Sequence, residues 1–476
     1  LREFVIGRAG GNPLFMEELT YALLEGGDIK RSNHTYSLSR KVWEIRVPDT
    51  IQGIIAARMD RLDPGSKRTM QTASVIGREF QYAILEMIAN DQPDLKARLS
   101  DLQASEFIHE KSFMPEVEYV FKHALVHEVA YNSLLFRRRR EIHEKIGNAI
   151  EALYGERLEE FYEMLGYHYT KSENKEKAYR YLKASGVKAS QRSSLWEAFR
   201  FFRDGINILK EQNLTSAAAA ERVEITLLLI TPMLALGFPE DSLYILQSSE
   251  GLAREVGDVR GITSLCSAIG LYFSIKGDIL RGLQYNEECF KVAQQEQNID
   301  LMAPVGFDLC ANYTARGEFL KTAAIAPEII GRLEASEKQF ESFGRGYNLY
   351  SALAAFHGFS TAYLGEYEQG RAILDKGLAL AERIGNLYSL GLIEVFYGYS
   401  YCHQGDGGPA LPHFEKAIAY LEKGQIFVLL GLAWSGVGWS YYFMGQPATA
   451  LPYLEKGLEI HTDANVAYNL SAHYWF

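Results

Sequence analysis

The stretch WSGVGWSYYFMGQPATALPYL, residues 434–454, decides the fold. Within it, Gly438 stands seven residues before Gly445, and Ala450 and Leu454 follow four residues apart. Residues four apart share one face of a helix. Glycine readily takes the positive φ that ends a helix. The spacing therefore predicts a helix, a tight turn at Gly445 and a second, antiparallel helix.

The turn glycine recurs along the second half of the chain at nearly constant intervals. Its positions are Gly237, Gly277, Gly317, Gly365, Gly405 and Gly445, with spacings of 40, 40, 48, 40 and 40 residues. In four of these units another glycine stands seven residues earlier: Gly270, Gly358, Gly398 and Gly438. Three of those glycines are followed, three residues later, by Phe273, Tyr401 or Tyr441. We expect the earlier glycine to let paired helices approach closely, with the aromatic ring filling the space beside it. The eight extra residues of the longer unit fall near 331–343, where we expect an extended helix or a loop.

This spacing resembles the tetratricopeptide repeat, whose pattern W-x2-L-G-x2-Y…A-x3-F is matched by residues 434–454. The period is 40 rather than 34 and the closing proline is missing, which longer helices would explain. HEAT and armadillo arrays share the longer period but lack this glycine and tyrosine spacing. Weaker helical units over 159–171, 174–191 and 194–212 precede the glycine series. A single helix pair cannot bury its apolar face, so we expect stacked pairs that form an α-solenoid, or superhelix, over 157–476.

Composition limits the class of protein. The 476 residues include 49 Lys and Arg against 60 Asp and Glu, a formal charge of 49 − 60 = −11, and 47% are hydrophobic. Disorder as the main state is excluded by the apolar content, and a protein that coats nucleic acid is usually basic. The four cysteines form no CxxC pair and are expected to be buried, reduced thiols. No signal peptide opens the chain, so we expect a cytoplasmic location.

One stretch is long enough to span a bilayer without a charge, residues 424–454. It contains glutamines, serines and several glycines, and the repeat explains it as one helix, a turn and the start of another. We therefore expect no membrane span. The chain lacks a starting Met and stops before the next turn glycine is due, so we expect both ends to continue in a longer reading frame.

The first 155 residues follow a different pattern. Helices are expected over 13–26, 47–62, 66–76, 81–90 and 94–105, with a short hairpin over 28–43. Residues 107–121 alternate in polarity as strands do. Three helices followed by a strand pair are typical of a winged helix. Its third helix carries Lys96 and Arg98 against Asp94, Asp101 and Glu106, and the run Arg137–Arg140 is followed by Glu141 and Glu144. We therefore do not expect nucleic acid as a partner.

Motifs for catalysis are missing from the sequence. It contains no Walker A motif, G-x-x-x-x-G-K-[ST], so this chain alone is not expected to hydrolyse ATP. His123 and His127 stand four apart, but no third metal ligand is evident, so we expect no metal site. We identify no Ser/His/Asp or Cys/His arrangement suited to nucleophilic catalysis. Whether the complete protein is an enzyme depends on segments outside this chain.

Four segments together resemble the signal-transduction ATPases with numerous domains (STAND). They are GNPLFMEEL (11–19), VPDTIQGIIAARMDRL (47–62), ASVIGREF (73–80) and FKHALVHEVAYNSLL (121–135). The combination is similar to bacterial proteins that join a class III adenylate/guanylate cyclase, an AAA-type ATPase and a tetratricopeptide tail. The resemblance implies lid helices over 1–63, a winged helix and linker helix over 64–156, and the solenoid over 157–476. The cyclase and the Walker segments would lie upstream.

The resemblance also implies two contacts to ATP or ADP. The family's GxP segment maps to Gly11, Asn12 and Pro13, with the proline against the adenine. A Met-His-Asp segment that reads the β-phosphate maps to Lys122-His123-Ala124, where alanine replaces the family's aspartate. Each residue also has a purely structural explanation, because proline suits a first helical position and a histidine can pack at a helix start.

The hypothesis from these observations is a regulatory sensor. The concave surface of the solenoid, rich in Tyr and Phe, would bind a protein or peptide partner and thereby control a nucleotide-dependent switch linked to an upstream cyclase. One alternative is a transcription regulator with the same ATPase and repeats, whose DNA-binding domain lies outside this chain. Another is a pure repeat scaffold.

Overall fold

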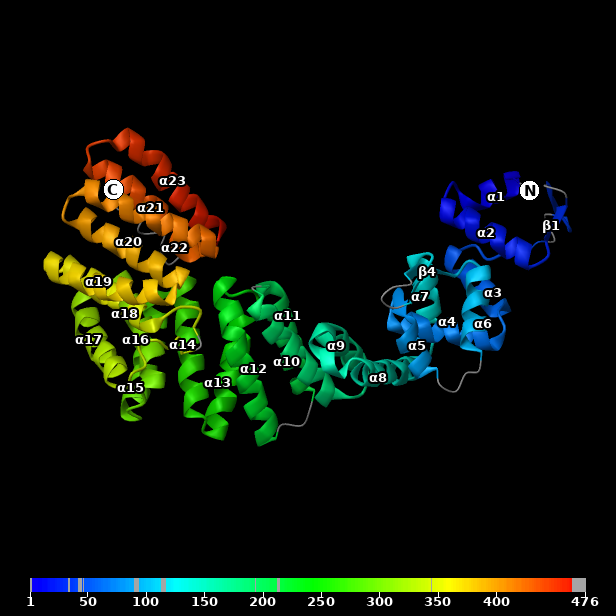
Figure 1. Cartoon of the computed structure of the whole chain (residues 1–476), viewed down its shortest axis with the longest axis horizontal. Coiled ribbons are helices and arrows are strands. Elements are labelled where there is room, and N and C mark those ends of the chain that lie inside the picture. The colour runs from blue at the N-terminus through cyan, green and yellow to red at the C-terminus, as the bar shows by residue number, and fades with distance from the viewer. Residues whose placement is uncertain are drawn as a thin grey trace. The chain divides into compact units, whose positions relative to one another are not determined.

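The computed structural model describes residues 2–32, 35–41, 45, 47–89, 94–112, 117–192, 194–211, 215–343 and 345–464. The chain divides into two compact units, Leu1–Ser185 and Gly186–Phe476 (Figure 1). The division falls inside helix α10 (Lys175–Gln191). The boundary expected between residues 156 and 157 stays a prediction.

The first unit combines helices with two small antiparallel sheets. Its helices are α1 (Arg2–Ala9), α2 (Pro13–Glu25), α3 (Ile51–Arg61), α4 (Pro64–Ile76), α5 (Tyr82–Ile88), α6 (Leu95–Ala104), α7 (Ala124–Asn132), α8 (Phe136–Leu153), the 3-10 helix η2 (Gly155–Phe161) and α9 (Tyr162–Lys171). The strands are β1 (Ile29–Ser32), β2 (Thr35–Leu38), β3 (Glu79–Gln81), β4 (Ile108–Ser112) and β5 (Glu118–Phe121). The predicted helices are confirmed. The hairpin is also confirmed by the antiparallel pairing of β1 and β2, although residues 33, 34, 42 and 43 of that segment lie outside the described residues.

The second sheet has the order β3-β5-β4. The alternation expected at its centre is confirmed, because Tyr119 and Phe121 on β5 are buried while Glu118 and Val120 are only partly buried. Strand β3 was not expected from the sequence. It forms because Glu79, Phe80 and Gln81 pair with β5, and the Phe80 ring packs on Tyr119 at 5.7 Å. The helix predicted from residue 81 therefore begins at Tyr82.

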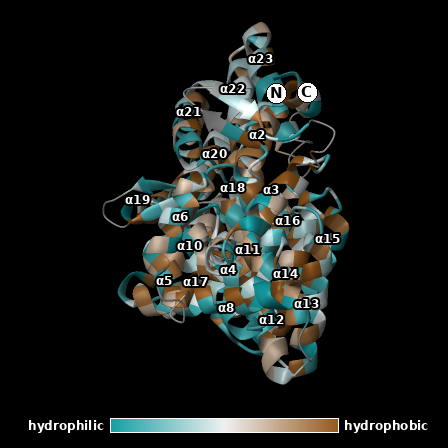
Figure 2. Ribbon diagram, turned by 90° about the vertical axis from the view of Figure 1, so that its right-hand side faces the viewer, coloured by the Kyte–Doolittle hydropathy of each residue, from teal (hydrophilic) through white to brown (hydrophobic). Residues whose placement is uncertain are grey.

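The second unit is a solenoid of antiparallel helix pairs. Its helices are α11 (Leu195–Lys210), α12 (Ser216–Ala235), α13 (Ser242–Val256), α14 (Val259–Ile275), α15 (Ile279–Gln295), α16 (Ile299–Ala315), α17 (Phe319–Ala335), α18 (Leu349–Tyr363), α19 (Tyr367–Ile384), α20 (Leu387–His403), α21 (Gly407–Gly424), α22 (Phe427–Phe443) and α23 (Pro447–Asp463). All six turn glycines have positive φ, from 67° at Gly237 to 100° at Gly365, as the repeat predicts. In Figure 2, hydrophobic and hydrophilic residues are interleaved along the helices, as expected of helices that bury one face.

The close approach expected inside each pair is confirmed. A Cβ atom at Gly398 on α20 would lie 2.7 Å from the ring of Phe414 on α21, and one at Gly438 would lie 2.7 Å from Leu454. The aromatic residues three positions later stack across their own pairs. The ring contacts are Phe273–Tyr285 at 5.7 Å, Tyr401–His413 at 5.8 Å and Tyr441–Tyr453 at 5.4 Å.

The longer unit contains a loop. Helix α17 ends at Ala335 and α18 begins at Leu349, so the additional residues lie in the connection 336–348 rather than in an extended helix. This connection brings Arg345 and Tyr347 to the inner side of the array, as described below.

The uncharged stretch 424–454 is accounted for by the repeat. It consists of the end of α21, the whole of α22, a turn and the first half of α23. Across the residues that the structure describes, no helix combines the length and apolar character needed to cross a bilayer. The four cysteines are buried and unpaired with one another, as predicted.

Candidate functional site

A cavity of about 1690 Å³ lies within the second unit. Most of its lining comes from the first helices of the pairs, α14, α16, α18, α20 and α22, with α12 and the connections between pairs; α11, α17, α21 and α23 contribute a few residues at their ends. We call this cavity the inner pocket. Helices α13, α15 and α19 contribute none of the described lining residues. The inner pocket is therefore built mainly by one repeated face of the solenoid.

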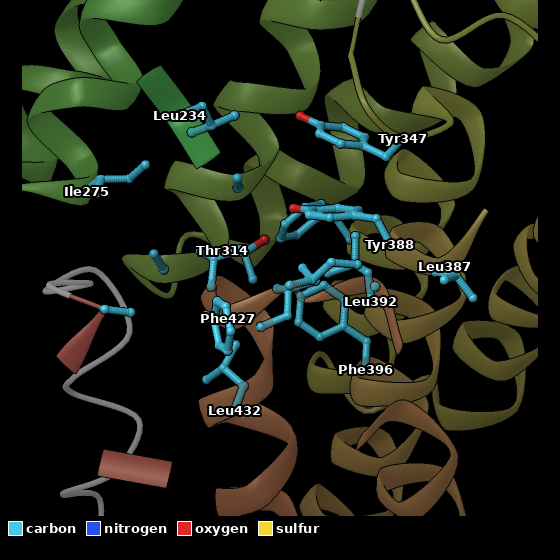
Figure 3. Close-up of a pocket in the computed structure, with 18 of the residues that line it drawn as sticks. Leu234, Ile275, Thr314, Tyr347, Leu387, Tyr388, Leu392, Phe396, Phe427 and Leu432 are labelled. Carbon is cyan, nitrogen blue, oxygen red and sulfur yellow. The ribbon is translucent and has the colours of Figure 1, made fainter. Parts of the chain in front are cut away.

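The wall of the inner pocket is mainly apolar and aromatic. Figure 3 shows Leu234, Ile275, Leu392, Phe396 and Leu432 directed into the open space. Among the described lining residues, those with a formal charge are Glu422, Lys423 and Asp463. An occupant with a mostly apolar surface fits such a wall, because burying apolar area contributes about 25 cal/mol per Å².

The aromatic rings run from one repeat to the next. The ring centroid of Phe356 on α18 lies 5.4 Å from that of Phe307 on α16 and 5.0 Å from that of Phe396 on α20. Phe359 stacks on Phe396 at 4.7 Å. These positions recur because each repeat presents the same helix face inward. The predicted Tyr- and Phe-rich surface is confirmed as the lining of the inner pocket.

A polar cluster lies next to this wall. Asp308 on α16 is fully buried, and its Oδ2 accepts from Arg345 Nη2 at 2.9 Å and from the hydroxyl of Ser267. Arg345 Nη2 also lies 3.1 Å from Ser267 Oγ. Burial raises the pKa of the Asp308 carboxyl, and the neighbouring Arg345 charge only partly offsets that effect.

Two tyrosines lie beside this cluster. The rings of Tyr347 and Tyr388 stack with centroids 4.4 Å apart, and both hydroxyls are directed toward the open space (Figure 3). Burial raises the pKa of both phenols, so both keep their protons at neutral pH. Asn312, one helical turn after Asp308, lines the inner pocket and is 1% exposed. The structure gives neither Asn312 Nδ2 nor Arg345 Nη1 a hydrogen-bond partner among the described residues.

The predicted GxP contact forms the start of α2 in the first unit. Gly11 has φ of 84°, which suits glycine, and Asn12 caps the helix by accepting from Phe15 N at 3.2 Å. Pro13 is the first helical residue. These three residues therefore have the structural roles that the sequence also allowed. Their contact with a nucleotide stays a prediction.

The other predicted contact lies near the same helix. His123 stands at the N-cap of α7, and its Nε2 lies 3.3 Å from Glu17 Oε2, one turn along α2 from Pro13. Lys122 Nζ donates to Glu17 Oε1 at 2.6 Å and to Glu106 Oε2 at 2.8 Å. Its hydrogen bond holds the pKa of Glu17 below the usual value. The structure therefore brings His123 and the GxP helix together through Glu17.

His127 has a different environment from His123. Its Nε2 donates to the carbonyl of Ser74 at 2.8 Å, and burial lowers the pKa of the imidazole. Within the described ranges, no group of three His, Cys, Asp or Glu side chains is arranged to hold a metal ion.

Sequence reasoning missed two buried ion pairs. Arg58, 1% exposed, donates to Glu18 at 2.5 Å and to Glu25 at 2.6 Å, which joins α3 to α2. The pair of Asp308 and Arg345 was also missed. Aligning the repeats gives a signal for the second pair, because Asp308 stands nine residues before its turn glycine, where two other repeats have Phe356 and Phe396.

No protein-family model matches the chain. A curated protein of Rhizobium meliloti (strain 1021), "uncharacterized protein R02095", is 23% identical over 219 residues, which are 44% of this chain and 20% of that protein. The match thus spans about a fifth of the length of this relative.

Solved structures give further likenesses. A Rap protein complexed with Competence and Sporulation Factor has a TM-score of 0.50 at 9% identity, covering 87% of this chain and 99% of that chain. The Rap conjugation gene regulator of plasmid pLS20, in complex with the Phr* peptide, also has a TM-score of 0.50. It is 10% identical, and the match covers 84% of this chain and 96% of that chain. A STAND protein with a tetratricopeptide repeat sensor from Pyrococcus horikoshii has a TM-score of 0.41 at 14% identity. The match covers 98% of this chain and 69% of that chain. The two Rap likenesses show a shared helical-repeat fold.

Proposed function

We propose that the solenoid is a sensor that binds an extended peptide, or an extended segment of a partner protein, in the inner pocket. The observation that carries this proposal is the continuous aromatic wall around a cavity of about 1690 Å³. Small-molecule pockets usually measure about 300–1,000 Å³, so this volume suits a longer occupant. The rings stacked across successive repeats provide apolar contacts along the length of such a chain.

The fold supports the same proposal. The Rap regulator of similar fold was solved with the Phr* peptide, so a peptide ligand is compatible with this architecture. Charged side chains are few among the described lining residues, which favours a peptide with mostly apolar side chains.

Peptide display against the complete 476-residue chain tests this proposal. Phe427, which lines the inner pocket and is 53% exposed, offers a substitution that disturbs little packing. We expect Phe427→Glu to weaken binding of a selected peptide at least tenfold, because a carboxylate would replace an apolar contact. Leu320→Glu is the matched control, since Leu320 is 74% exposed on α17 and does not line the inner pocket. Equal affinities for both variants would contradict binding at this site.

We further propose that peptide binding controls a nucleotide-dependent switch. In this proposal the first unit supplies the lid helices and a winged helix of a STAND-type ATPase, with an upstream cyclase as the output, in the cytoplasm. Support comes from the resemblance of four segments and from the short distance between His123 and Glu17 on the GxP helix. ATP or ADP would contact Pro13 and His123.

The switch is tested in a protein that contains the upstream ATPase segment. His123→Ala should weaken nucleotide binding and change basal activity, because an imidazole N–H can donate to a phosphate oxygen. His109→Ala is the control, since His109 is a partly exposed histidine on β4. Unchanged nucleotide affinity and unchanged basal activity in His123→Ala would remove this residue from the site.

A further inference from the structure

Asp308 is an exception in the repeat, next to Phe307 in the wall of the inner pocket. Nine residues before the turn glycine, the other repeats of the array have Leu228, Ala268, Phe356, Phe396 and Gly436. A carboxylate at this inward position is fully buried. Burying a charge costs free energy unless it is paired. Here the pairing comes from outside the repeat, through Arg345 at 2.9 Å.

The irregular spacing of the turn glycines leads to the same place. The one 48-residue interval arises from the connection 336–348, which carries Arg345 and Tyr347. Tyr347 packs on Phe307 of α16 at 5.1 Å and stacks on Tyr388 at 4.4 Å. The extra residues thus place a guanidinium and a phenol beside the buried carboxyl of Asp308.

This cluster offers hydrogen-bond donors that the described residues leave unused. Arg345 Nη1 and Asn312 Nδ2 are buried without a partner. The Tyr347 and Tyr388 hydroxyls are directed into the open space (Figure 3). Buried polar groups in native proteins are nearly always paired, so a cluster of unpaired donors needs an explanation. A ligand that supplies acceptor oxygens would provide their partners.

We infer that Asn312, Arg345, Tyr347 and Tyr388 form an anchor for a carboxylate of the peptide bound in the inner pocket. A carboxylate offers two oxygens that accept several hydrogen bonds and carries the charge opposite to that of Arg345. The inference rests on the proposed function, since it names the group by which the peptide is held. Arg345 uses Nη2 for Asp308 and Ser267, which leaves Nη1 for the ligand.

The carboxylate has two possible sources, the C-terminus of the peptide or an Asp or Glu side chain. Three pools of fluorescein-labelled decapeptides, random in Ala, Leu, Phe, Ser and Asn, distinguish them. The first pool has a free C-terminus, the second is amidated, and the third is amidated with one Glu at a random position. Fluorescence anisotropy with the complete 476-residue chain measures the affinity of each pool.

We expect the first or the third pool to bind about tenfold more tightly than the amidated pool without Glu. A preference for the first identifies the C-terminus, and a preference for the third identifies a side chain. Arg345→Met and the double variant Tyr347→Phe/Tyr388→Phe should lose this preference. The double variant keeps both rings, so its fold is retained if the stacking persists. Tyr313→Phe is the control, because the Tyr313 hydroxyl donates to Glu287 and the residue does not line the inner pocket.

Other outcomes overturn the inference. If all three pools bind equally, or if the preference survives in a folded double variant, these residues do not anchor a carboxylate, although peptide binding itself stands. If no pool binds, the anchor and the proposed peptide function fall together.

Discussion

Gly398→Ala should destabilise the repeat array, because the ring of Phe414 leaves no room for a methyl group. A Cβ at Gly398 would lie 2.7 Å from the ring, whereas carbon atoms normally approach to about 3.5–4.0 Å. The ring has little room to move, because Gly436 on α22 also packs closely against it: a Cβ there would lie 2.1 Å from the ring. Phe414 is fully buried between α20 and α22.

The magnitude follows from two opposing effects. Overpacking a core costs about 1–3 kcal/mol, and replacing a helical glycine by alanine returns about 1 kcal/mol. Because the ring is confined on both sides, we expect the cost near the upper end of its range and a net loss of about 1–2 kcal/mol. Gly331→Ala on α17 is the matched control, since no atom lies within 4 Å of its Cβ position. The free energy of unfolding of that variant should rise by roughly 0.5–1 kcal/mol.

Urea unfolding followed by far-ultraviolet circular dichroism measures both variants. The midpoint should fall for Gly398→Ala and rise for Gly331→Ala. In a Phe414→Leu background the cost of Gly398→Ala should shrink, because the smaller side chain frees the space and neighbouring substitutions couple. A Gly398→Ala variant that is as stable as Gly331→Ala would refute the packing argument.

Three further predictions concern stability. Arg58→Met should cost roughly 3–5 kcal/mol, measured by urea unfolding, because it leaves the buried Glu18 carboxylate without its partner. Acid should destabilise the first unit. Burial lowers the pKa of His143 to about 4 and that of His168 to about 3, whereas the pKa of a histidine in the unfolded chain is about 6.5. The unfolded chain therefore binds more protons below about pH 6.5, and the free energy of unfolding should fall by up to about 1.4 kcal/mol per pH unit for each histidine down to about pH 4. Gly445→Ala should lower the thermal midpoint, because φ is 77° there and alanine is strained at that angle by roughly 1 kcal/mol.

Each of these predictions has its own control and its own contradicting result. Arg68→Met, at an exposed position on α4, should change stability by less than about 0.5 kcal/mol, and an equal loss at Arg58 and Arg68 would discount the buried pair. His143→Gln should flatten the pH dependence, and an unchanged slope would exclude His143 as its source. Gly331→Ala serves as the control for Gly445→Ala as well, and a higher midpoint for Gly445→Ala would contradict the strain argument.

The repeat could be predicted from the sequence because its determinants are local and periodic. The turn glycines, the small residues seven positions earlier and the aromatic side chains act within one helix pair, and the structure confirms all three. The polar anchor could not be predicted in this way. Asp308 and Arg345 are 37 residues apart, and their contact depends on the path of the connection 336–348.

The first unit illustrates the same limit. Its helices follow from capping residues and hydrophobic periodicity, whereas the contact of Arg58 with Glu18 joins residues 40 apart. Pro13 opens α2 and His123 contacts Glu17 one turn along that helix, yet Pro13 and His123 each already have a structural role at a helix start. Geometry within this chain is compatible with both roles, so the nucleotide contacts stay predictions.

Amide hydrogen exchange of the complete chain, with and without a display-selected peptide, tests the central claim most directly. If the peptide occupies the inner pocket, protection should increase on the helices that line it, α14, α16, α18, α20 and α22, and on the connection that carries Tyr347. Helices α13, α15 and α19, which contribute no described lining residue, should change little. Protection confined to those outer helices, or to the first unit, would contradict the assignment of the inner pocket as the peptide site.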